Sequence, residues 1–179
     1  MLPEGGLPDR ARLERRALNY LARYPASQAR LEMVLRRRAR REAAGELEGL
    51  DALVRSVVVA LAERGLVDDR AFAEARARAL LRRGRSPRRV RAELTQDGVA
   101  AELIEPALRQ AAPEEPDLDR AAAVRYARRR GLGPFRPEPE RAARRDRDLR
   151  ALVRQGFGLP LARDVVDAAD PASLHDTLA

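Results

Sequence analysis

Apolar residues recur at spacings of three and four along nearly the whole chain, which predicts α-helices and no strands. The clearest stretch is 66–108. Asp68 and Asp69 predict a helix start there, because a carboxylate can accept hydrogen bonds from the unpaired amides of a first turn. Ser86, followed by proline, predicts a second start, and Gly98 predicts the end of that helix because glycine tolerates the left-handed backbone that commonly follows one. The stretch is therefore predicted to hold three short helices.

The periodic apolar side chains of this stretch form its predicted core. They are Phe72, Ala79, Leu80, Val90, Leu94, Leu103, Ile104, Ala107 and Leu108. Pro106 falls inside the third helix, where a proline costs about 3 kcal/mol through a lost hydrogen bond and a ring clash. We therefore expect that helix to be kinked or to begin later than its apolar pattern indicates.

The same unit can be found twice more, which predicts an internal repeat. Upstream, Ser27, Leu31, Leu35 and Ala39 correspond position for position to Ser86, Val90, Leu94 and Gly98. Downstream, Leu152 and Gly156 copy the step from Leu94 to Gly98, and the insert GLGPFRPEPE separates the first two helices of the third copy. We expect an all-α protein, an elongated tandem array of three three-helix repeats. Its predicted parts are a disordered N-terminal segment (1–9), repeat one (10–65), repeat two (66–112), an acidic linker (113–119), repeat three (120–169) and a polar C-terminal tail that frays (170–179).

Composition narrows the class of protein. Aromatic residues are only 3% of the 179, and much of the apolar content is alanine and leucine, so we expect small cores local to each repeat. The chain has no cysteine, which excludes disulfides and thiolate metal sites and suits a reducing compartment. No apolar run approaches the ~20 residues of a membrane span. We expect a cytoplasmic monomer without cofactor or metal.

Positive charge is the main functional signal. The net charge is +8, and all 36 basic residues are arginines. The segment 76–91 holds eight arginines and no acid, and smaller runs lie at 36–41, 128–130 and 141–150. Such a block favours a polyanionic partner, because its own repulsion is otherwise uncompensated. The alternative is a solvated surface in which arginines near helix C-termini offset the helix dipole.

Residues that could carry catalysis are scarce. His175 is the single histidine and lies in the tail. Asp68, Asp69 and Glu74 could suggest a metal site, but consecutive aspartates at a helix start are more often caps. The chain has no glycine-rich phosphate loop, so an enzyme is not expected. Tyr20 could stack on bases, together with Tyr24, although packing in the core is the favoured interpretation.

Several of these segments resemble the RecX family, regulatory proteins that modulate the RecA recombinase. The resemblance is carried by ALNYL (17–21) with Ser27, GLVDDRAFA (65–73), the segment 86–94 and RQGF (154–157), within the span 11–169. It implies a protein that binds the RecA filament and its single-stranded DNA, inhibits ATP hydrolysis and strand exchange, and thereby regulates recombination, DNA repair and the SOS response. The residues predicted to contact the filament or its DNA are Arg36, Arg37, Arg38, Arg76, Arg78, Arg82, Arg83, Arg85, Arg88, Arg89, Arg91, Arg128, Arg129 and Arg130.

A second hypothesis is a general helical nucleic-acid-binding module, architectural or transcriptional. In that case the helix in 86–94 would lie in the major groove and read bases. It offers Arg88, Arg89 and Arg91, but no Asn or Gln until Gln96, so its base reading would be poor.

Overall fold

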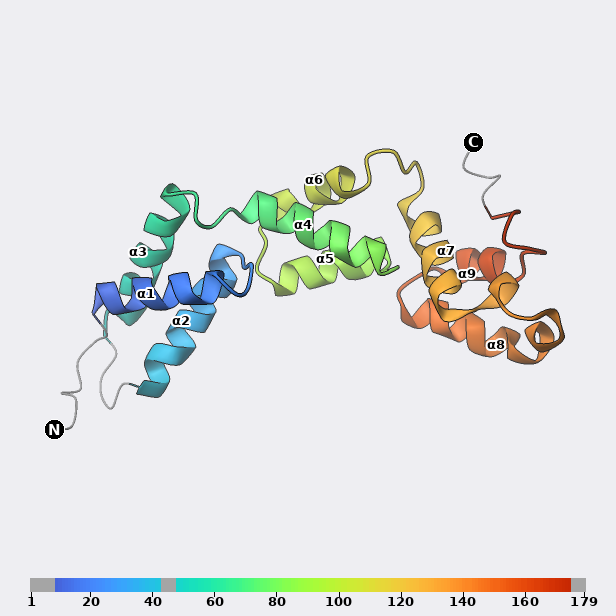
Figure 1. Ribbon diagram of the computed structural model, residues 1–179, viewed down its shortest axis with the longest axis horizontal. Helices are drawn as coiled ribbons and strands as arrows, with labels where there is room; N and C mark the ends of the chain where they lie inside the picture. The colour runs from blue at the N-terminus through green and yellow to red at the C-terminus, as the bar shows by residue number, and fades with distance from the viewer. Residues whose placement is uncertain (1–8, 43–47, 175–179) are drawn as a thin grey trace. The chain divides into compact units, whose positions relative to one another are not determined.

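The computed structural model describes residues 9–42 and 48–174. These residues form nine α-helices and one 3₁₀ helix and contain no strand, which confirms the prediction of an all-α protein (Figure 1). Most of the N-terminal segment that we predicted to be disordered lies outside the described residues, as does His175. The chain divides into two compact units. One contains the residues up to Ala73 together with Thr95–Leu103, and the other contains Glu74–Leu94 together with the residues from Ile104 onward.

Three helices form the N-terminal part of the first unit. They are α1 (Arg10–Leu21), α2 (Gln28–Glu42) and α3 (Leu50–Glu63). α1 begins where the side chain of Asp9 accepts a hydrogen bond from the amide of Ala11, and α3 ends before Gly65, which has a φ of +69°. Their apolar faces share one buried cluster that includes Leu13, Leu31 and Val54. Because the cluster consists mainly of leucine, valine and alanine, its stability comes from aliphatic burial.

The middle of the chain has the three helices expected from its pattern. They are α4 (Asp69–Arg82), α5 (Pro87–Gln96) and α6 (Ala101–Ala111). Both predicted caps are confirmed: Asp68 Oδ1 accepts a hydrogen bond from the amide of Ala71 at 3.0 Å, and Ser86 Oγ accepts one from the amide of Arg89 at 3.2 Å. α6 continues through Pro106 and buries Ile104, Ala107 and Leu108, as its spacing predicts, whereas Leu103, also predicted in the core, is half-buried.

The C-terminal part of the second unit consists of α7 (Leu118–Arg130), the 3₁₀ helix η1 (Gly133–Phe135), α8 (Glu138–Arg154) and α9 (Leu159–Val166). The insert of the third copy supplies η1 and the first turn of α8. Asp148 of α8 is buried and holds η1 in place. Its carboxylate accepts hydrogen bonds from the amide of Gly133 at 3.0 Å and from the guanidinium of Arg136 at 3.1 Å. These hydrogen bonds join the insert to the helix that follows it.

A serine and a glycine turn meet at two equivalent places, one in each compact unit. In the first unit, Ser27 Oγ accepts a hydrogen bond from the amide of Arg30 and donates one to the carbonyl of Asp97, the residue before Gly98. In the second unit, Ser86 Oγ donates at 2.7 Å to the carbonyl of Gln155, the residue before Gly156. We refer to these two contacts as the first and the second serine–glycine junction. They confirm the correspondence of the serines and glycines in the repeat alignment.

Three features differ from the sequence-based expectations. Tyr24, expected on the apolar stripe of the first helix, is 58% exposed, and two residues of the predicted core, Phe72 and Ala79, are half-buried. α7 begins at Leu118, so the last two residues of the predicted acidic linker are helical. The described part of the tail packs instead of fraying, because Leu174 is buried in the cluster of the third repeat.

Candidate functional site

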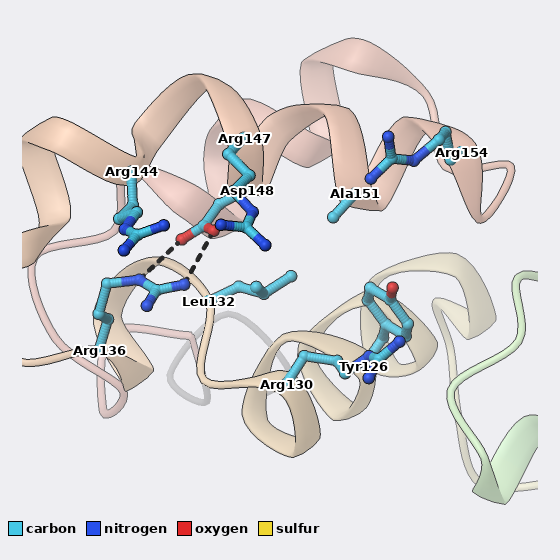
Figure 2. A pocket seen from close by; sticks show the side chains of 9 residues that line it. All are labelled: Tyr126, Arg130, Leu132, Arg136, Arg144, Arg147, Asp148, Ala151 and Arg154. Atoms are coloured by element: carbon cyan, nitrogen blue, oxygen red, sulfur yellow. Dashed lines mark hydrogen bonds and ion pairs between the residues drawn. The ribbon is translucent and has the colours of Figure 1, made fainter.

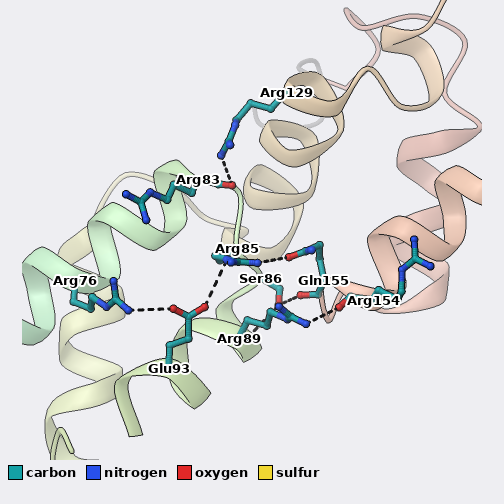
Figure 3. Close-up of polar contacts among 9 residues, drawn as sticks. All are labelled: Arg76, Arg83, Arg85, Ser86, Arg89, Glu93, Arg129, Arg154 and Gln155. Atoms are coloured by element: carbon teal, nitrogen blue, oxygen red, sulfur yellow. Dashed lines mark hydrogen bonds and ion pairs between the residues drawn. The ribbon is translucent and has the colours of Figure 1, made fainter. Parts of the chain in front are cut away.

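The arginine block 76–91 is only partly free of compensating acids in the folded chain. Arg76 and Arg85 both pair with Glu93 of α5, at 3.4 and 3.5 Å (Figure 3). Arg91 makes two hydrogen bonds to Glu105 of α6, at 2.6 and 3.1 Å, and these bonds hold the pKa of the Glu105 carboxyl below its usual range. Glu93 and Glu105 follow the acid-free stretch in sequence, and the fold places their carboxylates next to its arginines.

Two arginines of the block, Arg85 and Arg89, contact the second serine–glycine junction. Arg89 donates a hydrogen bond to the carbonyl of Arg154 at 3.0 Å, and Arg85 donates one to the side-chain oxygen of Gln155 at 2.9 Å. On the side of α7, Arg129 donates to the carbonyl of Arg83 at 2.5 Å (Figure 3). Three predicted binding residues therefore act within the fold: Arg89 and Arg129 donate to backbone carbonyls at helix ends, and Arg85 donates to a side-chain amide.

The other predicted arginines are also divided between structural contacts and solvent. Arg36 of α2 pairs with Glu32 at 2.6 Å and with Asp51 at 3.1 Å. Arg128 of α7 lies over the ring of Phe135, 5.5 Å from its centroid. The predicted residues whose guanidinium groups form no ion pair or hydrogen bond with the described part of the chain are Arg37, Arg38, Arg78, Arg82, Arg83, Arg88 and Arg130, all of them exposed.

These contacts weaken the hypothesis that α5 is a DNA-recognition helix. A recognition helix contacts base edges with its N-terminal residues. The N-terminus of α5 is instead occupied by the junction, since Ser86 and Pro87 are buried. Arg89 and Arg91 are engaged by the fold, which leaves Arg88 as the remaining cation of its first turns.

The two aspartates at the start of α4 act as helix caps, the interpretation favoured from the sequence. Asp68 caps its own helix, while Asp69 accepts a hydrogen bond at 2.8 Å from the amide of Gln28, at the start of α2. The carboxylate of Asp69 thus caps a helix that lies 41 residues away in sequence. Within the described residues, no group of three or more acidic, histidine or cysteine side chains could hold a metal ion. None of the described helices is both long and apolar enough to cross a membrane.

The structure also reveals a basic groove that the sequence analysis did not identify. It lies between α7 and α8 and has a volume of about 360 Å³. Its lining residues are Tyr126, Arg130, Leu132, Arg136, Arg144, Arg147, Asp148, Ala151 and Arg154 (Figure 2). The signal that could have located it is the spacing of positions 144, 147, 151 and 154, which puts them on one face of a helix. The basic run 141–150 contains only part of this series, since Arg154 lies beyond it.

The sequence of this chain is similar to those of known regulatory proteins. Residues 68–108, which contain α4, α5 and α6, match the family described as RecX, second three-helix domain. The Regulatory protein RecX of Myxococcus xanthus is 39% identical over 160 residues, which cover 87% of this chain and 84% of that protein. The chain belongs to the RecX family. A second RecX protein, from Halorhodospira halophila, is 38% identical over 79% of this chain and 86% of its own length.

The RecX fold extends over most of the chain. A crystal structure of regulatory protein RecX matches it with a TM-score of 0.61 and 22% sequence identity, over 89% of this chain and 72% of that one. The family assignment therefore confirms the resemblance drawn from segments such as GLVDDRAFA, which lies in the turn before α4 and in its first residues.

Proposed function

We propose that this RecX protein regulates homologous recombination and DNA repair by binding the RecA filament on single-stranded DNA and inhibiting its ATPase and strand exchange. The observation that carries the proposal is its relationship to Regulatory protein RecX over 87% of its length. RecA as the partner follows from the family's role. Restraint of ATP hydrolysis and strand exchange is the specific activity that we propose.

The distribution of arginine contacts supports a binding surface on the middle repeat. Arg78 and Arg82 are four residues apart on α4, so they share one face of that helix. Both are exposed and form no ion pair with the described residues, and the same is true of Arg88 on α5. Guanidinium groups that the fold leaves without partners can form paired hydrogen bonds with phosphate or carboxylate. We assign contact with the filament to these three arginines, in place of Arg85 and Arg89, which hold the second junction.

The direct test is a titration of RecA ATPase on single-stranded DNA with the parent protein and two charge-reversal variants. Arg82→Glu with Arg88→Glu removes two of the proposed contacts. Arg55→Glu with Arg163→Glu is the matched control, since it makes the same charge change at exposed positions of α3 and α9. If both contacts meet phosphate, a salt slope of about −0.7 per contact gives about fourfold in affinity for each at 0.15 M salt. The half-inhibitory concentration should then rise by more than about tenfold for the first variant and change little for the control.

Two results would count against this proposal. If the parent protein at saturating concentration leaves the RecA ATPase unchanged, the proposed function is wrong. If both variants lose inhibition equally, inhibition depends on the net charge of the protein, and the assignment of the contact to Arg82 and Arg88 is wrong. Both variants should keep the parent's melting temperature, because the substituted side chains are exposed.

A further inference from the structure

The groove between α7 and α8 has one basic face built by a single helix. Arg144, Arg147 and Arg154 follow one another along α8, and Tyr126 and Arg130 of α7 lie across from them (Figure 2). The series on α8 extends over ten residues, a distance of about 15 Å at 1.5 Å per residue. The groove therefore presents cations along its length and not at a single point.

The positive charge of the groove is not neutralised by the acidic side chains that line it. Five arginines line it, against the single carboxylate of Asp148, so the lining carries four formal positive charges in excess. Asp148 is buried and already occupied by Arg136 and by the amide of Gly133. The guanidinium groups of the other four arginines form no ion pair or hydrogen bond with the residues that the structure describes. Because neighbouring like charges repel, an anion in the groove would relieve a repulsion that the fold leaves in place.

The shape and the remaining lining indicate what kind of anion fits. A single small phosphate could engage two of the arginines and would leave the others uncompensated. A length of about 15 Å corresponds to roughly four phosphate steps at 3.4 Å per nucleotide of a stacked strand. Tyr126, whose ring packs against Phe157 with centroids 6.5 Å apart, also lines the groove, beside Leu132 and Ala151. Aromatic rings next to a basic track are the surface on which unpaired bases stack.

We propose that this groove binds single-stranded nucleic acid, with phosphates of one strand on Arg144, Arg147 and Arg154 and a base against Tyr126. Arg130 closes the opposite side. The groove is distinct from the surface on α4 and α5 and lies in the third repeat. The proposal rests on the proposed function only in naming the RecA filament as the source of the strand, since the binding itself requires no RecA.

The test is fluorescence anisotropy of a labelled oligothymidylate titrated with protein in the absence of RecA. Arg144→Gln with Arg147→Gln removes two proposed phosphate contacts, and Arg55→Gln with Arg163→Gln removes the same charge at exposed positions that do not line the groove. At 0.15 M salt the first variant should bind about fourteenfold more weakly, and its log–log salt slope should be smaller by about 1.4, from 0.7 per contact. The control should stay within about twofold of the parent, because neither of its side chains lines the groove and exposed charges outside a binding site are largely screened.

Three outcomes would overturn the proposal. An equal loss in both variants makes the effect one of net charge, and unchanged binding in the groove variant places the strand elsewhere. Equal affinity of the parent for a base-free strand of the same length removes the stacking contact at Tyr126. The ATPase titration separates this proposal from the previous one: a groove variant that loses the naked strand but inhibits RecA fully leaves the groove as a binding site and breaks its link to the filament.

Discussion

Replacement of Ser86 by alanine removes a hydroxyl that makes two hydrogen bonds at the second serine–glycine junction. One bond is accepted from the amide of Arg89 at 3.2 Å and caps α5, and the other is donated to the carbonyl of Gln155 at 2.7 Å. Gly156, across the junction, has a φ of +92°, and a β-carbon added there would lie 2.7 Å from the same hydroxyl oxygen. The serine and the glycine are therefore energetically linked, and a double-mutant cycle can measure the link.

The expected costs follow from these contacts. Ser86→Ala loses a cap worth about 1 kcal/mol and leaves the half-buried Gln155 carbonyl without its donor, about 1 kcal/mol more. Gly156→Ala places alanine in the left-handed region, about 1.5 kcal/mol, and adds a steric overlap of about 1.5 kcal/mol. In the double variant the hydroxyl is gone, and the next atoms are at 3.6 and 3.8 Å, ordinary contact distances. The double variant should therefore cost about 3.5 kcal/mol and not the additive sum of about 5, a coupling of about 1.5 kcal/mol.

The assay is urea unfolding of the four proteins of this cycle, followed by circular dichroism, with the effect expected in the unfolding of the second compact unit. The first junction provides a matched control. At Gly98 an added β-carbon would lie 2.6 Å from the β-carbon of Ala29, and Ser27 Oγ is 3.5 Å away. Removing the hydroxyl of Ser27 therefore leaves the overlap in place, and this cycle should be close to additive. Additive costs at Ser86 and Gly156, or an unchanged stability of Ser86→Ala, would refute the described junction.

Three further predictions concern stability. Leu94→Ala should cost about 2 to 5 kcal/mol, because its side chain is fully buried, whereas Phe72→Ala should cost less since Phe72 is only half-buried; urea denaturation compares the two. Asp69→Ala should cost about 0.5 to 2 kcal/mol as a lost cap of α2 and should speed hydrogen exchange of the first-turn amides of that helix, and exchange unchanged from the parent would contradict the cap. Arg145 makes two hydrogen bonds to Asp167, both at 2.6 Å, which lower the pKa of the Asp167 carboxyl. A lowered folded-state pKa stabilises the protein above the unfolded pKa of about 3.9, and this contribution is lost as the pH falls through the folded value, so Asp167→Asn should flatten the acid limb of stability measured against pH.

Features that depend on neighbouring residues could be predicted from the sequence. Ser86 and the proline after it specify a helix start because both act on the amides of the next turn, and Gly98 specifies a helix end because its left-handed φ of +77° is a property of one residue. The period of Val90 and Leu94 marks the buried face of the same helix. The repeat followed from these local signals, and the family resemblance from the segments that contain them.

The partner of each polar side chain depends on how distant segments pack together, which the sequence does not show. Asp69 stands at a helix start, where a local cap is expected, yet its carboxylate caps a helix 41 residues away in sequence. Ser86 likewise donates to a carbonyl 69 residues away. The block 76–91 lacks acids along the chain, yet folding brings Glu93 and Glu105 to three of its arginines. A long arginine side chain can reach the next turn of its own helix or a neighbouring helix, so sequence proximity is a poor guide to its partner.

The basic groove illustrates the same division. The spacing of Arg144, Arg147 and Arg154 was visible in the sequence, and it specifies one face of α8. That face becomes a groove because Asp148, buried in the third repeat, holds Gly133 and Arg136, and because Tyr126 of α7 lies opposite. Periodicity assigns a residue to a helix face, whereas packing between helices determines whether that face borders solvent, a core or a binding groove.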